Sequence, residues 1–471
     1  MNRITWRLVA ILLALVGLFV MGCGNGDDDD NDDNDNDNDN DQADDDAADD
    51  DAADDDSAEC PDADGDGFTD ATCGGEDCND ADDTIYPGAE DVCGDSIDQD
   101  CDDVADDGCL SWEVEAVTDP GFTCTDSANA WIKCYSIAFT PDGDPVVAVY
   151  DETNFDLQVG IRSAKGEWFL ETVDSDGEVG RDPSIDVDST GRIGVAYYTN
   201  DTTEIRVAMK SPGGNWKISS LGSVGGFMDI GGKPYLRFNS NDMAQVAGYK
   251  FLTGEVDYWQ ETAAGGWEKK RPFQQSAYGY GPVFDLDSQD HPGLVWQNEE
   301  DDYATRAFYF GYWNLETEGG QVSTIYSGPD PSGTPYHSFA FDGADTPHAF
   351  YALGLPMQIS MATYVDSTWQ KSKVPDDSSQ LTGPVEARRD PDGNLWISYG
   401  SDYPLTPRLG HLVGDTWSFI DVLDNTASQY GKKPSFNLDA DGLPGVVYYY
   451  QPDIMNGQLM YARMTGIPEV D

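Results

Sequence analysis

The residues best suited to chemistry in this sequence are aspartates that recur at every second position shortly after residue 60. The stretch reads Asp62-Ala-Asp64-Gly-Asp66-Gly-Phe68-Thr-Asp70. Carboxylates at positions 1, 3 and 5, with a backbone carbonyl at position 7, can surround one hard cation, and glycine at position 6 permits the sharp turn. We therefore expect these five residues to form a Ca²⁺ site. An ordinary acidic turn is the alternative.

The loop departs from the EF-hand pattern at one position. Cys73 stands at position 12, where an EF-hand carries a bidentate glutamate. The sequence is more similar to the short Asp-rich calcium loops of the thrombospondin type 3 kind.

A second pattern of acidic residues and cysteines follows directly. It reads Asp77-Cys-Asn-Asp-Ala-Asp82, then Tyr86-Pro-Gly-Ala, and ends in Asp98-Gln-Asp-Cys-Asp102. This resembles the MopE-type metal-binding motif, although the chain has Gln99 where the motif has asparagine and Gly-Asp at 94–95 where it has Asp-Gly. The resemblance covers about residues 77–109. It implies seven metal ligands: Asp77, Asn79, Asp80, Asp82, Asp98, Asp100 and Asp102.

The MopE family is labelled copper-binding, but the donor atoms in this chain favour calcium. Residues 60–109 contain no histidine and no methionine, and we expect their thiols to be oxidised. Carboxylate and amide oxygens are hard ligands that suit Ca²⁺, whereas copper prefers nitrogen and sulfur. We expect Ca²⁺ as the bound cation, with copper the less favoured choice.

Eight of the nine cysteines lie between residues 60 and 134. An even, clustered set in an exported chain predicts four disulfides, and eight cysteines allow 105 pairings. The simplest expectation joins sequence neighbours: Cys60 with Cys73, Cys78 with Cys93, Cys101 with Cys109, and Cys124 with Cys134. A segment of this size with few large apolar residues needs such links, because it cannot build a core of its own.

The ninth cysteine, Cys23, ends a pattern typical of an exported lipoprotein. Arg3 and Arg7 precede an apolar run that stops at Val-Met-Gly-Cys, which resembles a lipobox. The run has the length of a signal-peptide core and is shorter than the ~20 residues of a spanning helix. We expect a signal peptide over 1–22 and a lipid on Cys23, with plain secretory cleavage or an uncleaved anchor as alternatives. Gly24, in place of a retaining aspartate, favours the outer membrane or cell surface.

Charge is distributed unevenly along the chain. The 471 residues include 90 Asp and Glu but only 25 Lys and Arg, for a net charge of −65. Residues 24–59 are mostly Asp, Asn and Ala, a composition that predicts an extended, disordered tether. The negative charge excludes nucleic acid as a partner and favours divalent cations.

Residues 110–471 contain a repeat of about 50 residues. Each unit has an alternating strand, an Asp/Gly/Pro turn, a strand rich in Val and Tyr, a third strand, and in most units a fourth that begins at Trp. Four short strands per repeat predict an all-β fold, a β-propeller. The units start at Ser136, Ser184, Tyr235, Val283, Ser338, Val385 and Ser435.

The ends of the repeat array indicate how the ring closes. The last unit lacks a Trp strand, and an unassigned one, 111–117, precedes the first unit. We expect this strand to complete the last blade and give seven four-stranded blades. Because the third and fourth units match weakly, six or eight blades stay open. We expect the Trp and Tyr residues of the repeats to pack between blades.

Catalytic patterns are absent from the sequence. Four scattered histidines form no metal or triad motif, the sialidase Asp-box is missing, and the Asp/Gly clusters at 142–143, 287–290 and 439–442 resemble hairpin turns. We therefore name no catalytic residue. The connection over 118–134, closed by Cys124 and Cys134, lies where propellers usually bind ligands.

The sequence thus predicts four parts: a signal peptide (1–22), a lipidated tether (23–59), a Cys/Asp-rich metal-binding module (60–109) and a propeller (110–471). The main hypothesis is a membrane-anchored binding or scaffold lipoprotein whose propeller binds a glycan or protein ligand. The alternatives are a propeller glycosidase or lyase, and a metal-sequestering protein.

Overall fold

The computed structural model describes residues 60–89, 91, 97–101, 112–124, 133–163, 165–227, 230–250, 253, 255–270, 279–299, 305–314, 319–329, 336–354, 357–376, 384–400, 406–422, 432–450 and 456–465. The expected signal peptide, Cys23 and the tether lie outside these residues, as do Cys93, Asp102 and Cys109. In the described part, no helix has the length and apolar character needed to cross a membrane.

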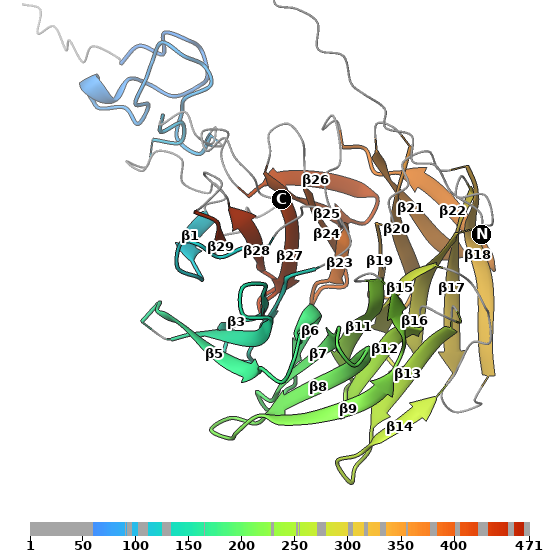
Figure 1. Ribbon diagram of the computed structural model, residues 1–471. Coiled ribbons are helices and arrows are strands. Elements are labelled where there is room, and N and C mark those ends of the chain that lie inside the picture. Colours follow the sequence, from blue (N-terminus) through green and yellow to red (C-terminus); the bar gives the residue numbers. More distant parts are fainter. Residues whose placement is uncertain are drawn as a thin grey trace, which may run out of the picture. The chain divides into compact units, whose positions relative to one another are not determined.

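Seven antiparallel sheets in the described residues form a β-propeller (Figure 1). Blades 1 to 3 consist of β2 (Tyr135–Phe139), β3 (Pro145–Asp151), β4 (Asp156–Arg162) and β5 (Trp168–Asp174); β6 (Arg181–Val187), β7 (Ile193–Thr199), β8 (Glu204–Lys210) and β9 (Lys217–Ser223); and β10 (Gly226–Phe227), β11 (Ile230–Phe238), β12 (Ala244–Lys250), β13 (Glu255–Glu261) and β14 (Trp267–Lys270).

Blades 4 to 6 consist of β15 (Gly279–Leu286), β16 (Pro292–Glu299), β17 (Thr305–Asn314) and β18 (Gly319–Pro329); β19 (His337–Phe341), β20 (Pro347–Leu353), β21 (Gln358–Val365) and β22 (Thr368–Lys373); and β23 (Glu386–Arg389), β24 (Leu395–Gly400), β25 (Pro407–Val413) and β26 (Thr416–Asp421). The weakly matching third and fourth repeats are therefore complete blades, the third with an additional short strand, β10. The prediction of seven blades is confirmed.

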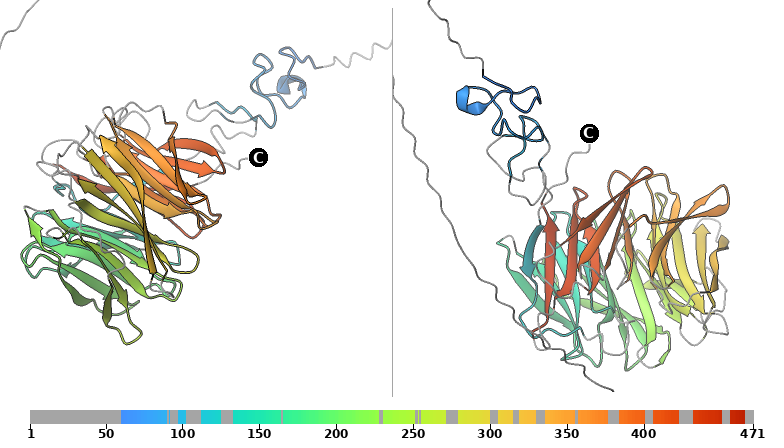
Figure 2. Two further views of the ribbon diagram at one scale, coloured as in Figure 1. Left: turned by 90° about the vertical axis from the view of Figure 1, so that its right-hand side faces the viewer. Right: turned by 90° about the horizontal axis from the view of Figure 1, so that it is seen from above.

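Blade 7 closes the ring with a strand from the N-terminal side. It contains β27 (Lys432–Leu438), β28 (Pro444–Tyr450), β29 (Gln458–Met464) and β1 (Trp112–Ala116). β1 pairs antiparallel with β29 from Trp112 opposite Met464 to Ala116 opposite Met460. The innermost strand β27 contacts β2 of blade 1, and the teal β1 lies beside the red β29 in Figures 1 and 2. The predicted closing strand is confirmed.

Glycines in the second strands let neighbouring blades approach closely. In three blades this glycine faces a phenylalanine at the end of the next blade's innermost strand. A Cβ would lie 3.0, 2.6 and 2.4 Å from the ring in the pairs Gly194–Phe238, Gly293–Phe341 and Gly445–Phe139. Real Cβ atoms do not occur at the two shorter distances, so these positions require glycine for the blades to pack.

The recurring Trp of the outer strand contacts the preceding blade. Trp168 in blade 1 donates to Glu115 of β1 at 2.8 Å, and Trp216 in blade 2 donates to Glu171 of β5 at 2.7 Å. Glu115 and Glu171 each lie three residues after the Trp that opens their strand. β1 therefore makes the same contact with blade 1 that an ordinary outer strand makes with the following blade. The expectation that these Trp side chains pack between blades is confirmed.

The Asp/Gly clusters are hairpin turns, as the sequence predicted. Asp287 Oδ1, for example, accepts the amides of Gln289 and His291, which closes the turn between β15 and β16. In blades 2, 3 and 4, a further bond joins the turn to that of the next blade through a serine hydroxyl and an aspartate. The pairs are Ser189–Asp242, Ser240–Asp290 and Ser288–Asp345, at 2.8, 2.6 and 2.5 Å. These carboxylates serve the fold and are engaged within the protein.

The described part of the Cys/Asp module contains a short 3₁₀ helix, η1 (Ala71–Cys73). Asp70 caps this helix by accepting the Thr72 amide at 2.7 Å. A backbone bridge then joins Asp70 to Asp77. Gly75 is required there, because a Cβ would lie 1.8 Å from the carbonyl oxygen of Thr69.

The disulfides of the described residues differ in part from the expected pairing. Cys60–Cys73 and Cys124–Cys134 are present as predicted, but Cys78 is bonded to Cys101. The predicted Cys78–Cys93 and Cys101–Cys109 pairs are therefore wrong. The reason is that the chain folds back: the Tyr86 amide donates to the Gln99 carbonyl at 2.8 Å, which brings Cys101 to a Cα distance of 5.6 Å from Cys78. Proximity in space, rather than in sequence, decides the pair.

Candidate functional site

Five aspartates of the two motifs come together in the module. Asp62, Asp64 and Asp66 form one group, and Asp64, Asp77 and Asp80 form another, with ligand oxygens within 4.8 Å of one another in each. Asp64 belongs to both groups. The structure therefore brings the Asp-rich loop and the start of the MopE-type motif together. The sequence had indicated two separate sites.

Each carboxylate in the centre of this cluster divides its two oxygens between two roles. Oδ1 of Asp64, Asp66 and Asp77 accepts a backbone amide two residues ahead, at 3.3, 2.8 and 2.8 Å. Oδ2 of the same three residues is buried and has no hydrogen-bond partner. The local turns thus hold the carboxylates in place and leave one oxygen of each available.

Asp77 is the most enclosed member of the cluster. Its exposed fraction is 0%, and its backbone is held by the Asp77 amide donating to the Thr69 carbonyl at 3.0 Å and by the Ala71 amide donating to the Asp77 carbonyl at 2.7 Å. Asp80 approaches from the same segment, and its Oδ1 accepts the Ala63 amide at 2.8 Å. The second motif is therefore tied to the loop by backbone and side-chain contacts.

The carboxylates of the cluster repel one another. The hydrogen bond from the Phe68 amide works to lower the pKa of Asp66. Partial burial and the charges of Asp64, Asp77 and Asp62 outweigh it, so the pKa is raised. Mutual repulsion of this kind is relieved when a cation binds between the groups.

The other predicted ligands make local contacts in the described residues. The Asp70 carboxylate caps η1, and the Asp82 carboxylate accepts the backbone amide and the hydroxyl of Thr84. The backbone amide of Asn79 donates to the Asp77 carboxylate. The ring of Phe68 stacks on Tyr86 with centroids 5.6 Å apart. Whether these residues also ligate stays a prediction.

Asp98 and Asp100 lie apart from the five-aspartate cluster. They form a third acidic group with Asp91, which the sequence analysis did not name. Asp91 also accepts the Gln99 amide at 2.7 Å. Asp102 lies outside the described residues.

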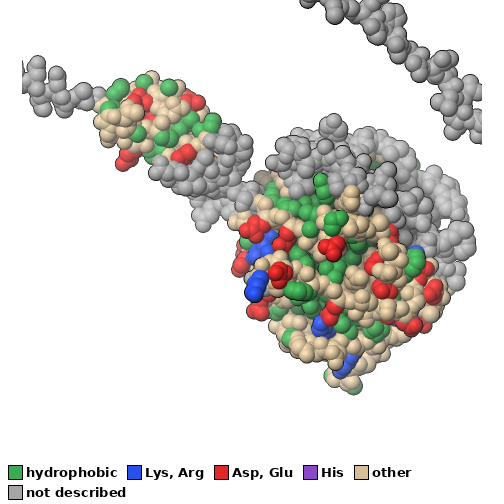
Figure 3. Space-filling view, turned by 60° about the vertical axis from the view of Figure 1, so that its left-hand side comes forward, with side chains coloured by type: hydrophobic (Ala, Val, Ile, Leu, Met, Phe, Trp, Pro, Cys, Tyr) green, Lys and Arg blue, Asp and Glu red, His purple; other side chains and the backbone are tan. Residues whose placement is uncertain are grey.

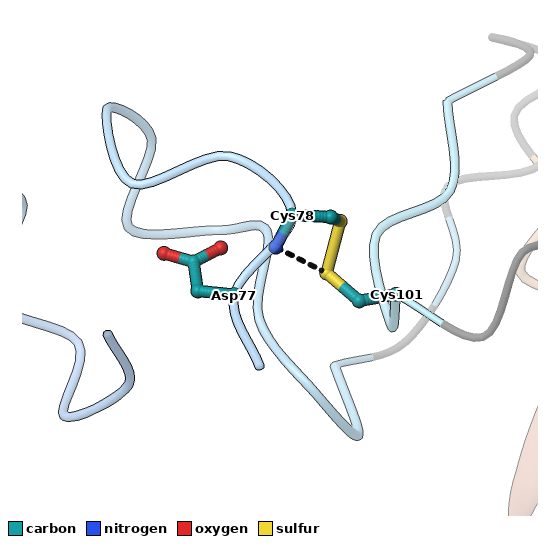
Figure 4. A group of neighbouring side chains, drawn as sticks. All are labelled: Asp77, Cys78 and Cys101. Carbon is teal, nitrogen blue, oxygen red and sulfur yellow. Dashed lines mark hydrogen bonds between the residues drawn. A yellow bond between two sulfur atoms is a disulfide. The ribbon is translucent and has the colours of Figure 1, made fainter. Parts of the chain in front are cut away.

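The sulfur atoms beside Asp77 are not thiolates. Cys78 and Cys101 form a disulfide, and the Cys78 amide donates to the Cys101 sulfur at 3.1 Å (Figure 4). An oxygen of the Asp77 carboxylate lies within 4.8 Å of both sulfurs, which are bonded to each other (Figure 4). The donors that remain are carboxylate oxygens, which fit a hard cation such as Ca²⁺ and offer a soft metal no thiolate or imidazole.

The propeller carries a second candidate site, a cavity of about 150 Å³ at one mouth of the central channel. Every blade contributes the residue at the same repeat position, within its innermost strand or, in blade 6, directly before it. These residues are Tyr135, Pro183, Pro234, Pro282, His337, Val385 and Pro434. Cys124 and Cys134 also line the cavity, so the disulfide that they form lies beside it.

Bulges at the channel mouth direct charged side chains toward the cavity. The register shifts immediately before Ser184 in blade 2 and Tyr235 in blade 3, and a proline occupies each shift. The preceding residues, Asp182 and Lys233, have φ of 49° and 30° and line the cavity. Bulges of this kind re-aim side chains, and proline is tolerated in them because no ladder hydrogen bond is lost.

The charges of the cavity form two close sets. Burial raises the pKa of Asp182 despite the neighbouring charge of Lys233 and the hydrogen bond from the Lys133 amide. Burial also works to raise the pKa of Glu386. The charges of Lys133, whose Nζ lies 2.5 Å from Glu386 Oε1, and of Arg388 outweigh burial, so the pKa is lowered. The cavity therefore presents both signs of charge beside tyrosine and proline rings.

Glu386 was missed by the sequence analysis. Four other blades have a serine at its position, and three of these serines accept an amide from the next blade; Ser338 Oγ, for example, accepts the Ala387 amide at 2.8 Å. Glu386 accepts the Phe436 amide in the same way, at 3.2 Å. Blade 6 therefore starts at Glu386 rather than Val385, and a one-residue shift of the repeat would have revealed it.

The histidines of the described residues do not assemble. His291, His348 and His411 each contact an aspartate of their own blade, and His337 lies 3.1 Å from the Gly281 carbonyl. Acidic side chains are scattered over the surfaces of the module and the propeller in Figure 3.

Comparison with known proteins supports the motif and is weak for the propeller. The family described as "Putative metal-binding motif" (Cu-binding MopE) matches residues 77–107. No curated protein matches the sequence.

Matching solved structures include polysaccharide lyase Uly1, at 10% identity over 76% of this chain and 99% of that chain, with a TM-score of 0.49. The Aleuria aurantia lectin AAL matches at 13% identity over 64% and 99%, with a TM-score of 0.41. The Penicillium chrysogenum α-L-arabinanase matches at 12% identity over 61% and 93%, with a TM-score of 0.42. Similarity of this degree supports no inference about ligand or chemistry. What the chain is shown to carry is the MopE-type metal-binding motif, followed by a seven-bladed propeller.

Proposed function

We propose that this chain is an exported lipoprotein, anchored through Cys23 in the outer membrane, whose module binds Ca²⁺ and whose propeller binds a glycan. The basic and apolar N-terminal pattern ending at Cys23 supports the anchor. The motif at residues 77–107 and the oxygen-only donor set support the metal. The Asp-rich segment between them supports a spacer that holds the folded parts away from the membrane.

The observation that carries the binding function is the pair of charged residues in left-handed conformation at the channel mouth. Asp182 and Lys233 have positive φ, and a non-glycine residue in this region costs on the order of 1–3 kcal/mol. Both side chains line the same cavity. Strain at two adjacent blades that serves one cavity is typical of a binding site, because it persists only where the surrounding structure holds it.

The chemistry of the cavity favours a sugar. Tyr and Pro rings supply flat apolar surface for the C–H face of a sugar ring, and Asp182 and Lys233 supply an acceptor and a donor for its hydroxyls. The volume of about 150 Å³ is smaller than the ~300–1,000 Å³ of sites that enclose drug-sized ligands. The cavity therefore suits the terminal unit of a longer glycan.

Glycan-array binding of the purified chain tests this function. Lys233→Ala should abolish the signal, whereas Lys165→Ala, an exposed lysine in the β4–β5 turn, should leave it unchanged. Release of reducing ends from the bound glycan would instead support the glycosidase or lyase alternative. Retention of the signal in Lys233→Ala would remove the cavity from consideration.

The anchor is tested separately by intact mass. The exported protein should begin at Cys23 and carry acyl groups, and Cys23→Ala should release the chain from membranes. A soluble, unmodified wild-type protein would contradict the anchor without affecting the glycan result.

A further inference from the structure

We propose that one Ca²⁺ ion is held jointly by the two sequence motifs, with Asp64 as the shared ligand and Asp77 as the buried one. The inference deepens the proposed Ca²⁺ binding of the module and rests on it. It replaces two separate sites, one in the loop and one in the MopE-type motif, by a single centre built from both.

Distances between the carboxylates allow one ion to bind Asp64 together with members of either group. Two oxygens that bind the same Ca²⁺ at about 2.4 Å can be at most about 4.8 Å apart. The ligand oxygens of Asp62, Asp64 and Asp66 satisfy this limit, and so do those of Asp64, Asp77 and Asp80. Because Asp64 is common to both groups, the simplest arrangement places a single cation beside it.

The unpartnered oxygens identify the centre of the site. Oδ2 of Asp64, Asp66 and Asp77 is buried without a hydrogen bond. The Asp77 side chain is wholly inaccessible, and an ionised carboxylate in that condition is costly unless a cation or a donor balances it. No donor of the described residues does so, which indicates that a cation is the missing partner.

The shared centre also explains why the loop departs from the EF-hand pattern. Position 12 of the loop is Cys73, which forms a disulfide with Cys60, and position 9 is Asp70, whose carboxylate caps η1. Cys73 therefore cannot act as the closing ligand, and the Asp70 carboxylate also has a structural role. Asp77 arrives at the loop through the backbone bridge to Asp70 and supplies the carboxylate that a glutamate would supply in an EF-hand.

The donor set selects the kind of cation. Five carboxylates contribute oxygen only, and the disulfide removes the neighbouring sulfurs. Ca²⁺ accepts six to eight oxygens in a flexible geometry, whereas Mg²⁺ demands an octahedron and usually keeps several waters. The site therefore prefers Ca²⁺ over Mg²⁺ and over copper.

Ca²⁺ stoichiometry in single and double variants tests the inference. The full chain is titrated with Ca²⁺ alone in 0.15 M KCl, which screens the Asp-rich segment. Asp66→Asn, from the loop, and Asp77→Asn, from the motif, should each lose the same tightly bound ion or weaken it at least about tenfold. The double variant should lose one ion in total. The matched control, Asp83→Asn, removes an exposed aspartate of the same segment and should bind as the wild type does.

The outcomes separate the two levels of the proposal. Loss of two ions in the double variant, or wild-type affinity in Asp77→Asn, would overturn the shared centre while leaving Ca²⁺ binding intact. Failure of the wild type to bind Ca²⁺ would overturn the calcium part of the proposed function itself. Should Asp77→Asn disturb the fold of the module, the half-buried Asp66→Asn still reports on the ion. Amide exchange at Gly65 and Gly67, slowed by Ca²⁺ in the wild type, should become insensitive to Ca²⁺ in Asp66→Asn.

Discussion

Replacing Glu115 by alanine should open the propeller at its closing seam. Glu115 of β1 accepts hydrogen bonds from Arg162 Nε at 2.5 Å and Nη2 at 3.2 Å, and also from the Trp168 indole at 2.8 Å. These contacts tie β1 to blade 1, while its backbone pairs with β29 of blade 7. Without Glu115, the strand loses these contacts with blade 1 and keeps its ladder with β29.

The expected magnitude follows from the exposure of the pair. The side chains of Arg162 and Glu115 are 24% and 28% exposed, so the ion pair is partly screened. A partly exposed two-point ion pair and the charge-assisted hydrogen bond from the Trp168 indole together give about 2–3 kcal/mol. The free energy of unfolding should fall by that amount in Glu115→Ala.

Glu171→Ala provides a matched comparison. Glu171 accepts Lys210 and the Trp216 indole in the corresponding position of β5, but it is 42% exposed. Because β5 is joined to β4 by a hairpin, this variant should lose only about 1 kcal/mol and leave its blade paired.

Urea unfolding and amide exchange distinguish the two variants. In Glu115→Ala, exchange should accelerate across β29, the strand that β1 covers, before global unfolding begins. In Glu171→Ala, exchange in β4 should stay close to that of the wild type. Equal destabilisation of the two variants, with no faster exchange in β29, would refute the view that Glu115 secures the seam.

Three further outcomes are expected. Gly445→Ala should destabilise the propeller by about 1–3 kcal/mol in urea unfolding, because its Cβ would lie 2.4 Å from the Phe139 ring; unchanged stability would contradict this packing. Burial lowers the pKa of His411, so its neutral form persists in the fold while the unfolded chain binds a proton below about pH 6.5. Stability should therefore fall as the pH drops from 7 to 5, less steeply in His411→Gln, as thermal melts would show. Peptide mapping without reduction should recover Cys78 linked to Cys101, and a Cys78–Cys93 peptide would be inconsistent with the fold.

The propeller could be predicted from the sequence because its repeats combine local signals with a fixed order. Alternating strands, Asp/Gly turns and the opening Trp recur in most units, and the closing strand repeats the same Trp pattern at Trp112. The register of single strands was less certain. The predicted start of the sixth repeat, Val385, lies one residue before Glu386. The role of Glu386 depends on the hydrogen bond from the Phe436 amide in the next blade, which the sequence does not show.

The residues of the five-aspartate cluster were each named from the sequence, but their assembly was not. The Asp-rich loop and the MopE-type motif were each visible, yet their union depends on the bridge between Asp70 and Asp77 and on the close approach at Gly75. The disulfide of Cys78 depends on a similar return of the chain. Such contacts arise from three-dimensional packing of a segment with no periodic pattern, so spacing alone could not reveal them.

The pairing of β1 with β29 has a mechanical consequence under the proposed anchorage at Cys23. A pull between the membrane and a bound glycan enters the propeller at Trp112, the first residue of β1. Strands within the other six blades are joined to one another by hairpins, whereas β1 is held to blade 7 only by noncovalent contacts. The weakest point under load is therefore this seam, and the force needed to detach five residue pairs sets the limit on how hard the protein can hold its ligand.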